Sequence, residues 1–450
     1  MEGEKKIVNR IISLLIIIAV LLSACTGNGK EENGDGKQEH VIPDGGTGTL
    51  KVAWGNLSAA TSSGLYELLP REGIPREEET PYSSAYNILY TDFETGKTVY
   101  LCNVPGCAHN SEDCTAYLEC SQGVYMMPDF TGEHIIFAAL GTRADITSKK
   151  ELPSVMIMDR DGSDRRELCR LKADEVIEGF VFFVDERYLY FLVDVMSTRE
   201  IRRIDLDTGE CDTIFTTVKY MNCIACRGNE MILLMYDSSG NDSYMSFSPY
   251  TMELREVQLV PPHYYRPVIT SQYSVSFYYK GHEEASEIDV VAFDNDTGQP
   301  VKTIKGIPHM QGSLVDLNLL TDSLVELSYH YEDPEEIEEV GNGKYLGGPI
   351  HWFSWIIDLD SGTYCENKLT YKSKGDSMEP MPVVAETGDG RLLVVLEDRD
   401  CTVTLTDYQG IPHLLEIEHP GRKVYGLISA EDFFAGIPDY HEVQTEVYSS

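Results

Sequence analysis

The chain has 450 residues, of which 42% are hydrophobic and 24% charged, so it is long and apolar enough to bury a sizeable core. Its 74 acidic residues outnumber the 36 basic ones and give a net charge of -38. A surface this acidic repels nucleic acid and anionic lipid headgroups, which excludes nucleic acid as a partner. Cations and basic proteins remain compatible with it, although such acidity most often only keeps a secreted domain soluble.

Residues 1–24 have the pattern of a secretory signal peptide. A basic head with Lys5, Lys6 and Arg10 precedes the apolar run at residues 11–22, which is shorter than the roughly 20 residues of a membrane span. The end of the run, Leu22-Ser23-Ala24-Cys25, resembles the lipobox of bacterial lipoproteins. The resemblance implies that Cys25 carries a diacylglyceryl group and holds the chain at the extracellular face of the cell membrane. An ordinary cleaved signal with a chance cysteine is the alternative.

Residues 25–48 are rich in Gly, Asn, Glu and Lys and nearly free of apolar side chains. This composition predicts a disordered tether. We therefore expect the folded part to cover residues 49–450.

A short hairpin motif recurs along that part, with an aspartate before a glycine-containing turn. Its copies begin at Asp92, Asp159, Asp205, Asp294, Asp358 and Asp407, and a degenerate copy lies at residues 245–250. The usual step is about 45 residues, which suits four short strands and their turns, the unit of a β-propeller blade. Seven copies predict an all-β propeller of seven four-stranded blades. Two β-sandwiches built from ordinary hairpins are the alternative, and long helical periodicity is absent.

Strand candidates precede most of the turns. They are rich in β-branched, aromatic and aliphatic residues and are bounded by Gly, Asp or Asn. These candidates cover residues 134–138, 188–193, 231–236, 275–279 and 392–396.

The first long step contains a cysteine-rich insertion at residues 102–120. Cys102, Cys107, His109 and Cys114 have the number and kind of ligands of a closed structural zinc site. Pro105-Gly106 would turn the backbone so that the first two sulfurs converge, and Cys107 and His109 would share a face in an extended segment. The spacing differs from that of a zinc knuckle.

Disulfide bonds are the competing interpretation of the insertion, because a secreted chain meets an oxidising environment and Cys120 supplies a fourth cysteine. Free thiols are a third. A catalytic zinc is disfavoured because four protein ligands leave no position for water. Elsewhere, Cys223-Ile224-Ala225-Cys226 has the spacing of a thiol-redox motif, but its flanks read as strand and turn rather than as the helix start that such a site needs.

Two later segments stand outside the repeat. The second long step contains an acidic insertion at residues 332–348, which we interpret as a solvated loop. After the last repeat, Ser429 to Asp432 could begin one helical turn with a capping box, with Phe433 and Phe434 covering a blade edge. Alternatively the tail adds a last strand and closes the ring with residues 48–54.

The turn from Met158 to Leu168 resembles the blade signature of TolB-type propellers. The chain from lipobox through cysteine insertion is similar to Gram-positive surface lipoproteins with propeller-like domains of unknown function. The resemblance implies a cell-envelope protein without assigned chemistry. The sequence contains no nucleophile elbow, zinc-protease helix motif, phosphate-binding loop or dinucleotide fingerprint.

Two functions are compatible with these features. The first is a monomeric, non-catalytic binding or scaffold lipoprotein whose protein, peptide or glycan partner meets aromatic residues at the channel mouth, with Trp352, Trp355, Tyr264 and Tyr265 as candidates. The second is a lyase or hydrolase acting on cell-wall or extracellular polysaccharide. For that enzyme His263 would be the base and Arg266 would hold an acidic sugar, although an exposed loop is the simpler interpretation of that segment.

Overall fold

The computed structural model describes most of the compact unit formed by residues 44–450. The described residues are 48–70, 84–120, 123–140, 152–236, 242–262, 264–279, 287–309, 314–332, 338–341, 344–346, 350–372, 378–387, 389–406, 412–443 and 447–448. The predicted signal peptide, the lipidation site Cys25, the tether and the turn at Asp407 lie outside them. No helix among the described residues is long and apolar enough to span a membrane.

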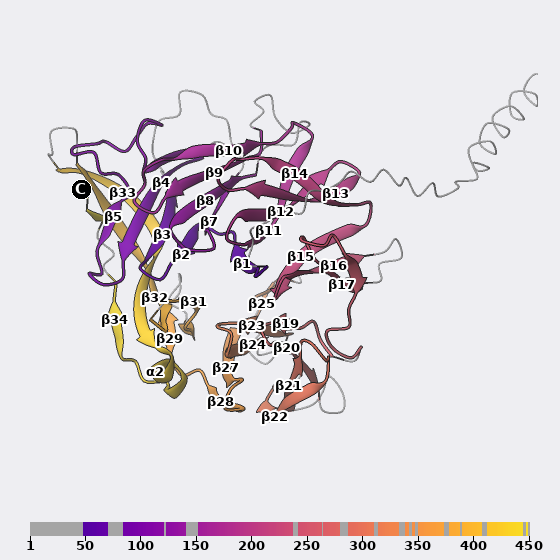
Figure 1. Ribbon diagram of the computed structural model, residues 1–450. Coiled ribbons are helices and arrows are strands. Elements are labelled where there is room, and N and C mark those ends of the chain that lie inside the picture. Colours follow the sequence, from indigo (N-terminus) through magenta and orange to yellow (C-terminus); the bar gives the residue numbers. More distant parts are fainter. Residues whose placement is uncertain are drawn as a thin grey trace, which may run out of the picture. The chain divides into compact units, whose positions relative to one another are not determined.

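Seven β-sheets follow one another along the chain and form the blades of a β-propeller (Figure 1). We number the blades 1 to 7 in chain order. The first three consist of β2 (Ser58–Ala60), β3 (Gly64–Pro70), β4 (Ser84–Asp92), β5 (Thr98–Tyr100) and β6 (Tyr117–Cys120); of β7 (Val124–Pro128), β8 (His134–Ala139), β9 (Ser154–Asp159) and β10 (Arg166–Arg170); and of β11 (Glu175–Val184), β12 (Tyr188–Val195), β13 (Thr198–Asp205) and β14 (Cys211–Thr217).

Blades 4 to 7 complete the series. They consist of β15 (Tyr220–Arg227), β16 (Glu230–Tyr236), β17 (Asp242–Phe247) and β18 (Leu254–Glu256); of β19 (Val268–Ile269), β20 (Tyr273–Tyr279), β21 (Glu287–Asp294) and β22 (Pro300–Pro308); of β23 (Leu314–Leu319), β24 (Leu324–Glu332), β27 (Ile350–Asp358) and β28 (Thr363–Glu366); and of β29 (Thr370–Lys372), β30 (Met378–Pro380), β31 (Val383–Glu386), β32 (Arg391–Thr406), β33 (Pro412–Ser429) and β34 (Tyr440–Glu442). All five predicted strand candidates lie within these strands. The predicted seven-bladed propeller is confirmed, and the alternative of two sandwiches is wrong.

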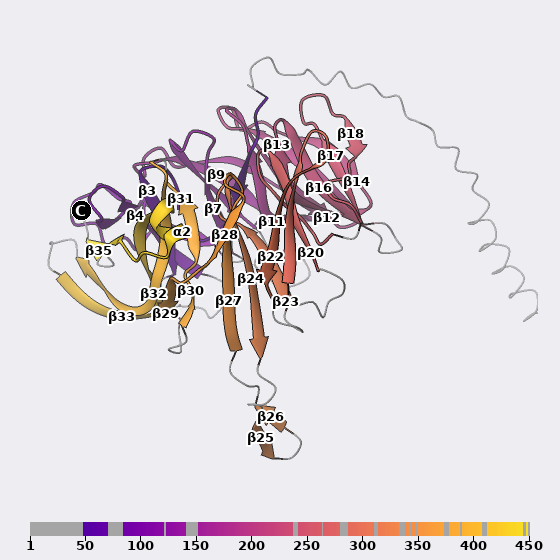
Figure 2. The ribbon, with the colours of Figure 1, turned by 90° about the horizontal axis from the view of Figure 1, so that it is seen from below.

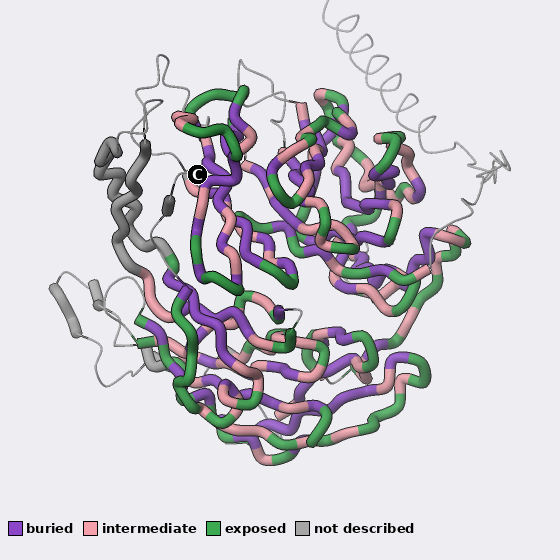
Figure 3. Tube along the Cα trace, turned by 60° about the vertical axis from the view of Figure 1, so that its left-hand side comes forward, coloured by how far each residue is buried: buried purple, intermediate pink, exposed green. Residues whose placement is uncertain are grey.

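Each blade buries its faces against its neighbours. One core cluster joins Ile136 and Ile157 of blade 2 to Phe182 and Phe191 of blade 3. Figure 3 shows buried residues along the middle of the sheets and exposed residues at many of the turns. This arrangement explains the apolar strand candidates, since the middle strands are covered on both faces.

The first described strand, β1 (Lys51–Trp54), does not close the ring. It pairs with β11, with Trp54 opposite Val181, and so becomes an additional fifth strand at the inner edge of blade 3 (Figure 1). The expectation that residues 48–54 join the C-terminal tail is therefore wrong. Leu50, which precedes the strand, is buried and donates its backbone N–H to the carbonyl of Gly228 in blade 4 at 2.9 Å.

The tail closes the ring without these residues. Strand β35 (Val447–Tyr448) pairs in parallel with β5 of blade 1, and Val443 packs in a core cluster with residues of blades 1 and 7. The Tyr425 hydroxyl of blade 7 donates to Glu67 of blade 1 at 3.0 Å. The predicted helical turn is present as α2 (Ala430–Ala435), capped by Ser429.

The acidic insertion is structured in part. Strands β25 (Glu338–Gly341) and β26 (Lys344–Leu346) form a hairpin that projects beyond β24 and β27 (Figure 2). Residues 338–341 and 344–346 are thus strands rather than loop, and the solvation of the insertion stays a prediction. Residues 333–337 lie outside the described part of the chain.

Candidate metal centre and aromatic surface

The outer strand of blade 1 is split in two by the cysteine-rich insertion. Strand β5 pairs with one half of β4, and β6 pairs with the other half. Ile88 joins the halves, because its carbonyl accepts from Leu101 at 3.0 Å and its N–H donates to Ala116 at 2.8 Å. Residues 102–115 therefore leave the sheet and return to it at adjacent positions of β4.

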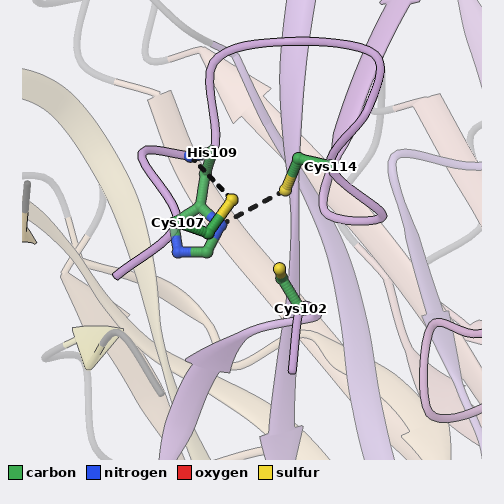
Figure 4. A group of neighbouring side chains, drawn as sticks. All are labelled: Cys102, Cys107, His109 and Cys114. Carbon is green, nitrogen blue, oxygen red and sulfur yellow. Dashed lines mark hydrogen bonds between the residues drawn. The ribbon is translucent and has the colours of Figure 1, made fainter. Parts of the chain in front are cut away.

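Four side chains of this excursion converge on one point. Ligand atoms of Cys102, Cys107, His109 and Cys114 all lie within 4.8 Å of one another (Figure 4). Cys102, His109 and Cys114 are buried, while Cys107 is half-buried. The structure thus brings together all four predicted metal ligands.

Two local backbone features produce this convergence. Gly106 has φ +71°, and the N–H of Cys107 donates to the carbonyl of Val104 at 3.2 Å, which is the predicted Pro-Gly turn. His109 has φ +49°, so the segment is not extended as expected. Instead the His109 N–H donates to the Cys107 sulfur at 3.5 Å, and the bent backbone brings the ring to the sulfurs.

The donor set fits a tetrahedral metal ion. Tetrahedral zinc bonds of about 2.3 Å to sulfur and 2.0–2.1 Å to nitrogen place ligand atoms roughly 3.5–3.8 Å apart. The distance from His109 Nδ1 to Cys114 Sγ is 3.3 Å, close to that spacing. Cys120, the fourth cysteine of the disulfide interpretation, donates its thiol to the Gly123 carbonyl at 3.0 Å. The cluster can hold a metal, and four ligands make it a closed site.

Neighbouring residues hold residues 102–115 in place, and burial affects the ionisation of a cysteine in the cluster. Tyr100 stacks on the His109 ring at 4.4 Å between centroids, and Asn87 donates to the His109 carbonyl at 2.9 Å. Arg165 of blade 2 donates to the carbonyls of Thr115 and Glu112 at 3.3 and 3.2 Å. Burial raises the pKa of the Cys114 thiol, and a bound cation would oppose that effect by stabilising the thiolate.

The segment with thiol-redox spacing lies in a strand, as its flanks indicated. Cys223 and Cys226 lie on β15 rather than at a helix start. Burial raises the pKa of Cys223 to about 12 and that of Cys226 to about 11. Thiols that remain protonated at neutral pH are poor nucleophiles.

The predicted aromatic candidates lie in blades 5 and 6, where contacts through Tyr279, His309 and Tyr329 connect Tyr265 to Trp355. Trp355 packs edge-on against Tyr364, and Tyr264 packs against Tyr278 and Phe293 within blade 5. Tyr265 stacks on Phe277, and Trp352 tilts against His330 with 42% of its surface exposed. His263 lies outside the described residues. Arg266 donates to the Tyr236 hydroxyl at 3.2 Å.

The structure reveals a different aromatic surface near the inner edge of blade 3. Trp54 of β1 stacks on Phe180 of β11 at 5.8 Å, although both side chains are more than half exposed. Elsewhere in blade 3, Arg199 pairs with Glu178 and lies over the half-exposed ring of Tyr220 at 3.9 Å. The sequence did not indicate these residues, because a single Trp or Phe does not show which face of its strand it lies on or which residue it pairs with.

No protein-family model matches the chain, and no curated protein matches it. Solved structures that resemble it include the β-propeller domain of the trilobed protease from Pyrococcus furiosus, with 8% identity, a TM-score of 0.46, and 88% of this chain and 98% of that one covered. An oligogalacturonate lyase in complex with manganese has 12% identity, a TM-score of 0.44, and coverages of 84% and 90%. TolB from Acinetobacter baumannii has 12% identity, a TM-score of 0.33, and coverages of 82% and 78%. The assignment to the propeller class rests on the seven sheets themselves.

Proposed function

We propose that the protein is a non-catalytic binding or scaffold propeller, anchored through a lipid at Cys25 to the extracellular face of the cell membrane. The exposed stack of Trp54 on Phe180 carries the binding part of this proposal. Large aromatic side chains that stay exposed to solvent on a rigid propeller contribute little to the stability of the fold. Such exposed aromatic patches often bind a partner. We infer that the partner is a glycan or a peptide that stacks on these rings.

The metal centre supports a scaffold role. Its four protein ligands leave no open position for water, so a bound zinc would hold residues 102–115 against blade 1 without performing chemistry. The formal net charge of -38 supports a neutral or basic partner and disfavours nucleic acid.

Binding can be tested with purified residues 48–450, soluble cell-wall glycan fragments and a basic peptide. We expect saturable binding that Trp54→Ala weakens about tenfold, because a ring-stacking contact contributes about 0.5–1.5 kcal/mol beyond its buried area. The control is Tyr440→Ala on blade 7, an exposed ring that is not part of the stack, which should bind as the parent does. Equal binding by both variants and the parent would remove Trp54 from the site. Release of unsaturated sugar ends from polygalacturonate would instead show a lyase and overturn the non-catalytic assignment.

The metal centre gives a second prediction. Mass spectrometry of the native protein should find one zinc per chain, and Cys107→Ser should lose it together with several degrees of melting temperature. Cys120→Ser is the matched control, because its thiol bonds to Gly123 outside the cluster, and it should retain the zinc. A metal-free parent whose thiols appear only after reduction would support the disulfide interpretation.

The anchor is tested separately. Expression of the full chain in a Gram-positive host should place it in the membrane fraction, labelled by radioactive palmitate. Cys25→Ser should abolish the label and release the protein. Unchanged labelling would exclude Cys25 as the lipidated residue.

A further inference from the structure

Two cysteines on neighbouring blades face each other outside the metal centre. Cys169 lies on β10, the outer strand of blade 2, and Cys211 begins β14, the outer strand of blade 3. Both are half-buried and pack against the edge of the core cluster that joins the two blades. Their thiols are close enough to affect each other's pKa.

Close backbone packing holds the pair together. Arg166, three residues before Cys169, donates to the carbonyl of Leu206 in the next blade at 3.1 Å. Gly209, two residues before Cys211, lies so close to β10 that a Cβ atom there would be 2.5 Å from the Leu168 carbonyl oxygen. The outer edges of blades 2 and 3 are therefore in backbone contact next to the two cysteines.

A fixed guanidinium lies beside the thiols. Arg202 interacts with both cysteines. Its position is set by Glu175 and Glu200, whose carboxylates it contacts at 2.7 Å. Its charge helps to lower the pKa of Cys169, although Glu175 and Glu200 offset part of that charge.

The two thiols are chemically unequal. The Cys211 thiol, together with Arg202, lowers the pKa of Cys169 despite burial and the opposing charges of Glu167 and Glu175. The Cys169 sulfur and burial raise the pKa of Cys211. One cysteine thus favours the thiolate, and its neighbour keeps a proton, as in pairs that exchange disulfides.

We propose that Cys169 and Cys211 form a thiol–disulfide exchange site that accepts a small disulfide and closes into a bond between blades 2 and 3. The Cys169 thiolate attacks one sulfur of the disulfide RSSR, forms a mixed disulfide and releases RS⁻, which is protonated to RSH. Cys211 then loses its proton and attacks the Cys169 sulfur, so that the Cys169–Cys211 bond forms and the second RS⁻ leaves as RSH. Two cysteines lose two electrons, and RSSR gains them.

Oxidised glutathione is a suitable probe. The full chain, reduced and freed of reductant, is incubated with it, blocked with iodoacetamide, digested and analysed by mass spectrometry. We expect a peptide containing the Cys169–Cys211 bond as the main cross-link, and its loss after treatment with dithiothreitol. A folded chain without that cross-link would overturn the proposal.

Two variants distinguish the roles of the sulfurs. Cys211→Ser should accumulate glutathione on Cys169, while Cys169→Ser should modify Cys211 more slowly, because burial still raises the pKa of the Cys211 thiol after its sulfur partner is removed. Cys365→Ser is the matched control, because its half-buried thiol bonds only to the Phe434 carbonyl among the described residues and should leave the cross-link unchanged. Equal glutathione transfer to Cys169 and Cys211 in the two variants would contradict the order of attack. Circular dichroism confirms that each variant retains the β-structure.

Discussion

At the scale of single residues, the repeated aspartate organises the hairpin turns by accepting backbone N–H groups. Asp205 accepts from Asp207 and Thr208, and Asp294 accepts from Thr297. In the degenerate copy, Ser248 replaces the aspartate and Met252 takes the positive φ that glycine has elsewhere. The repeat was predictable from sequence because this turn chemistry is local.

Gly209 should be much less tolerant of a side chain than Gly362, although both have positive φ. Alanine at either position meets the left-handed backbone cost of about 1–2 kcal/mol. At Gly209 the new Cβ would also approach the Leu168 carbonyl, which adds roughly 1–3 kcal/mol. Urea unfolding of Gly209→Ala and Gly362→Ala measures the difference, and equal destabilisation would show that blades 2 and 3 separate easily.

Asp205 should contribute stability that depends on pH. Burial opposes its ionisation, but the Thr208 N–H and Arg187 outweigh burial and hold its pKa below the ordinary 3.8. Its contribution is therefore complete above about pH 4 and is lost as the pH falls through the lowered native pKa. Asp205→Asn should cost about 1–3 kcal/mol at pH 7 and less at pH 3, as measured by urea unfolding.

Asp294→Asn is the comparison for Asp205→Asn. The Asp294 carboxylate accepts hydrogen bonds from Thr297 and is not paired with an arginine. A smaller change at pH 7 is expected for it. A destabilisation by Asp205→Asn that stays constant from pH 7 to pH 3 would point to packing rather than charge.

At the scale of elements, the sequence indicated the identity of the strands and the metal ligands but not the path of the loop. Cys102 and Cys114 were proposed as ligands because three cysteines and a histidine have the number and kind of ligands of a zinc site, with disulfide bonds as the alternative. The return of β6 to β4 was not predictable, because it depends on pairing between residues more than 25 positions apart. The left-handed backbone of His109 likewise has no sequence signal.

The capping box of α2 gives a prediction at this scale. The Ser429 hydroxyl accepts from the Asp432 N–H at 3.0 Å, and Phe433 is buried against blade 7. Ser429→Ala should lower the free energy of unfolding by about 0.5–2 kcal/mol. Ser361→Ala, in an exposed turn, is the control for urea unfolding. Loss of stability in the control alone would show that α2 does not depend on its cap.

At the scale of the whole molecule, the period of the repeat predicts the seven-bladed ring. It does not predict which strands form the seam between the first and the last blade. Period and strand patterning predict how many blades pack side by side. They do not distinguish which terminal strand completes which sheet, because β1 and β35 are both short. Pairing of β1 with blade 3 is decided by tertiary packing of Leu50 and Ala53 in two different core clusters.

Removal of residues 440–450 should weaken the seam between blades 1 and 7. The truncation deletes β34 and β35, exposes the edges of β33 and β5, and removes the buried side chain of Val443. We expect a loss of about 2–4 kcal/mol, visible as a lower melting temperature. Truncation of residues 449–450 alone serves as the control. An unchanged melting temperature in the longer truncation would show that the tail does not close the ring.

The position of β1 also determines how the protein would respond to mechanical force. Among the described residues, a pull from the N-terminal side first loads the hydrogen bond of Leu50 to Gly228 and then those between β1 and β11. The seam at β5 and β35 lies on other blades and bears none of that initial load. A force that the cell surface applies to the N-terminal end would strain β1, the additional inner strand of blade 3. The ring of seven blades would stay closed.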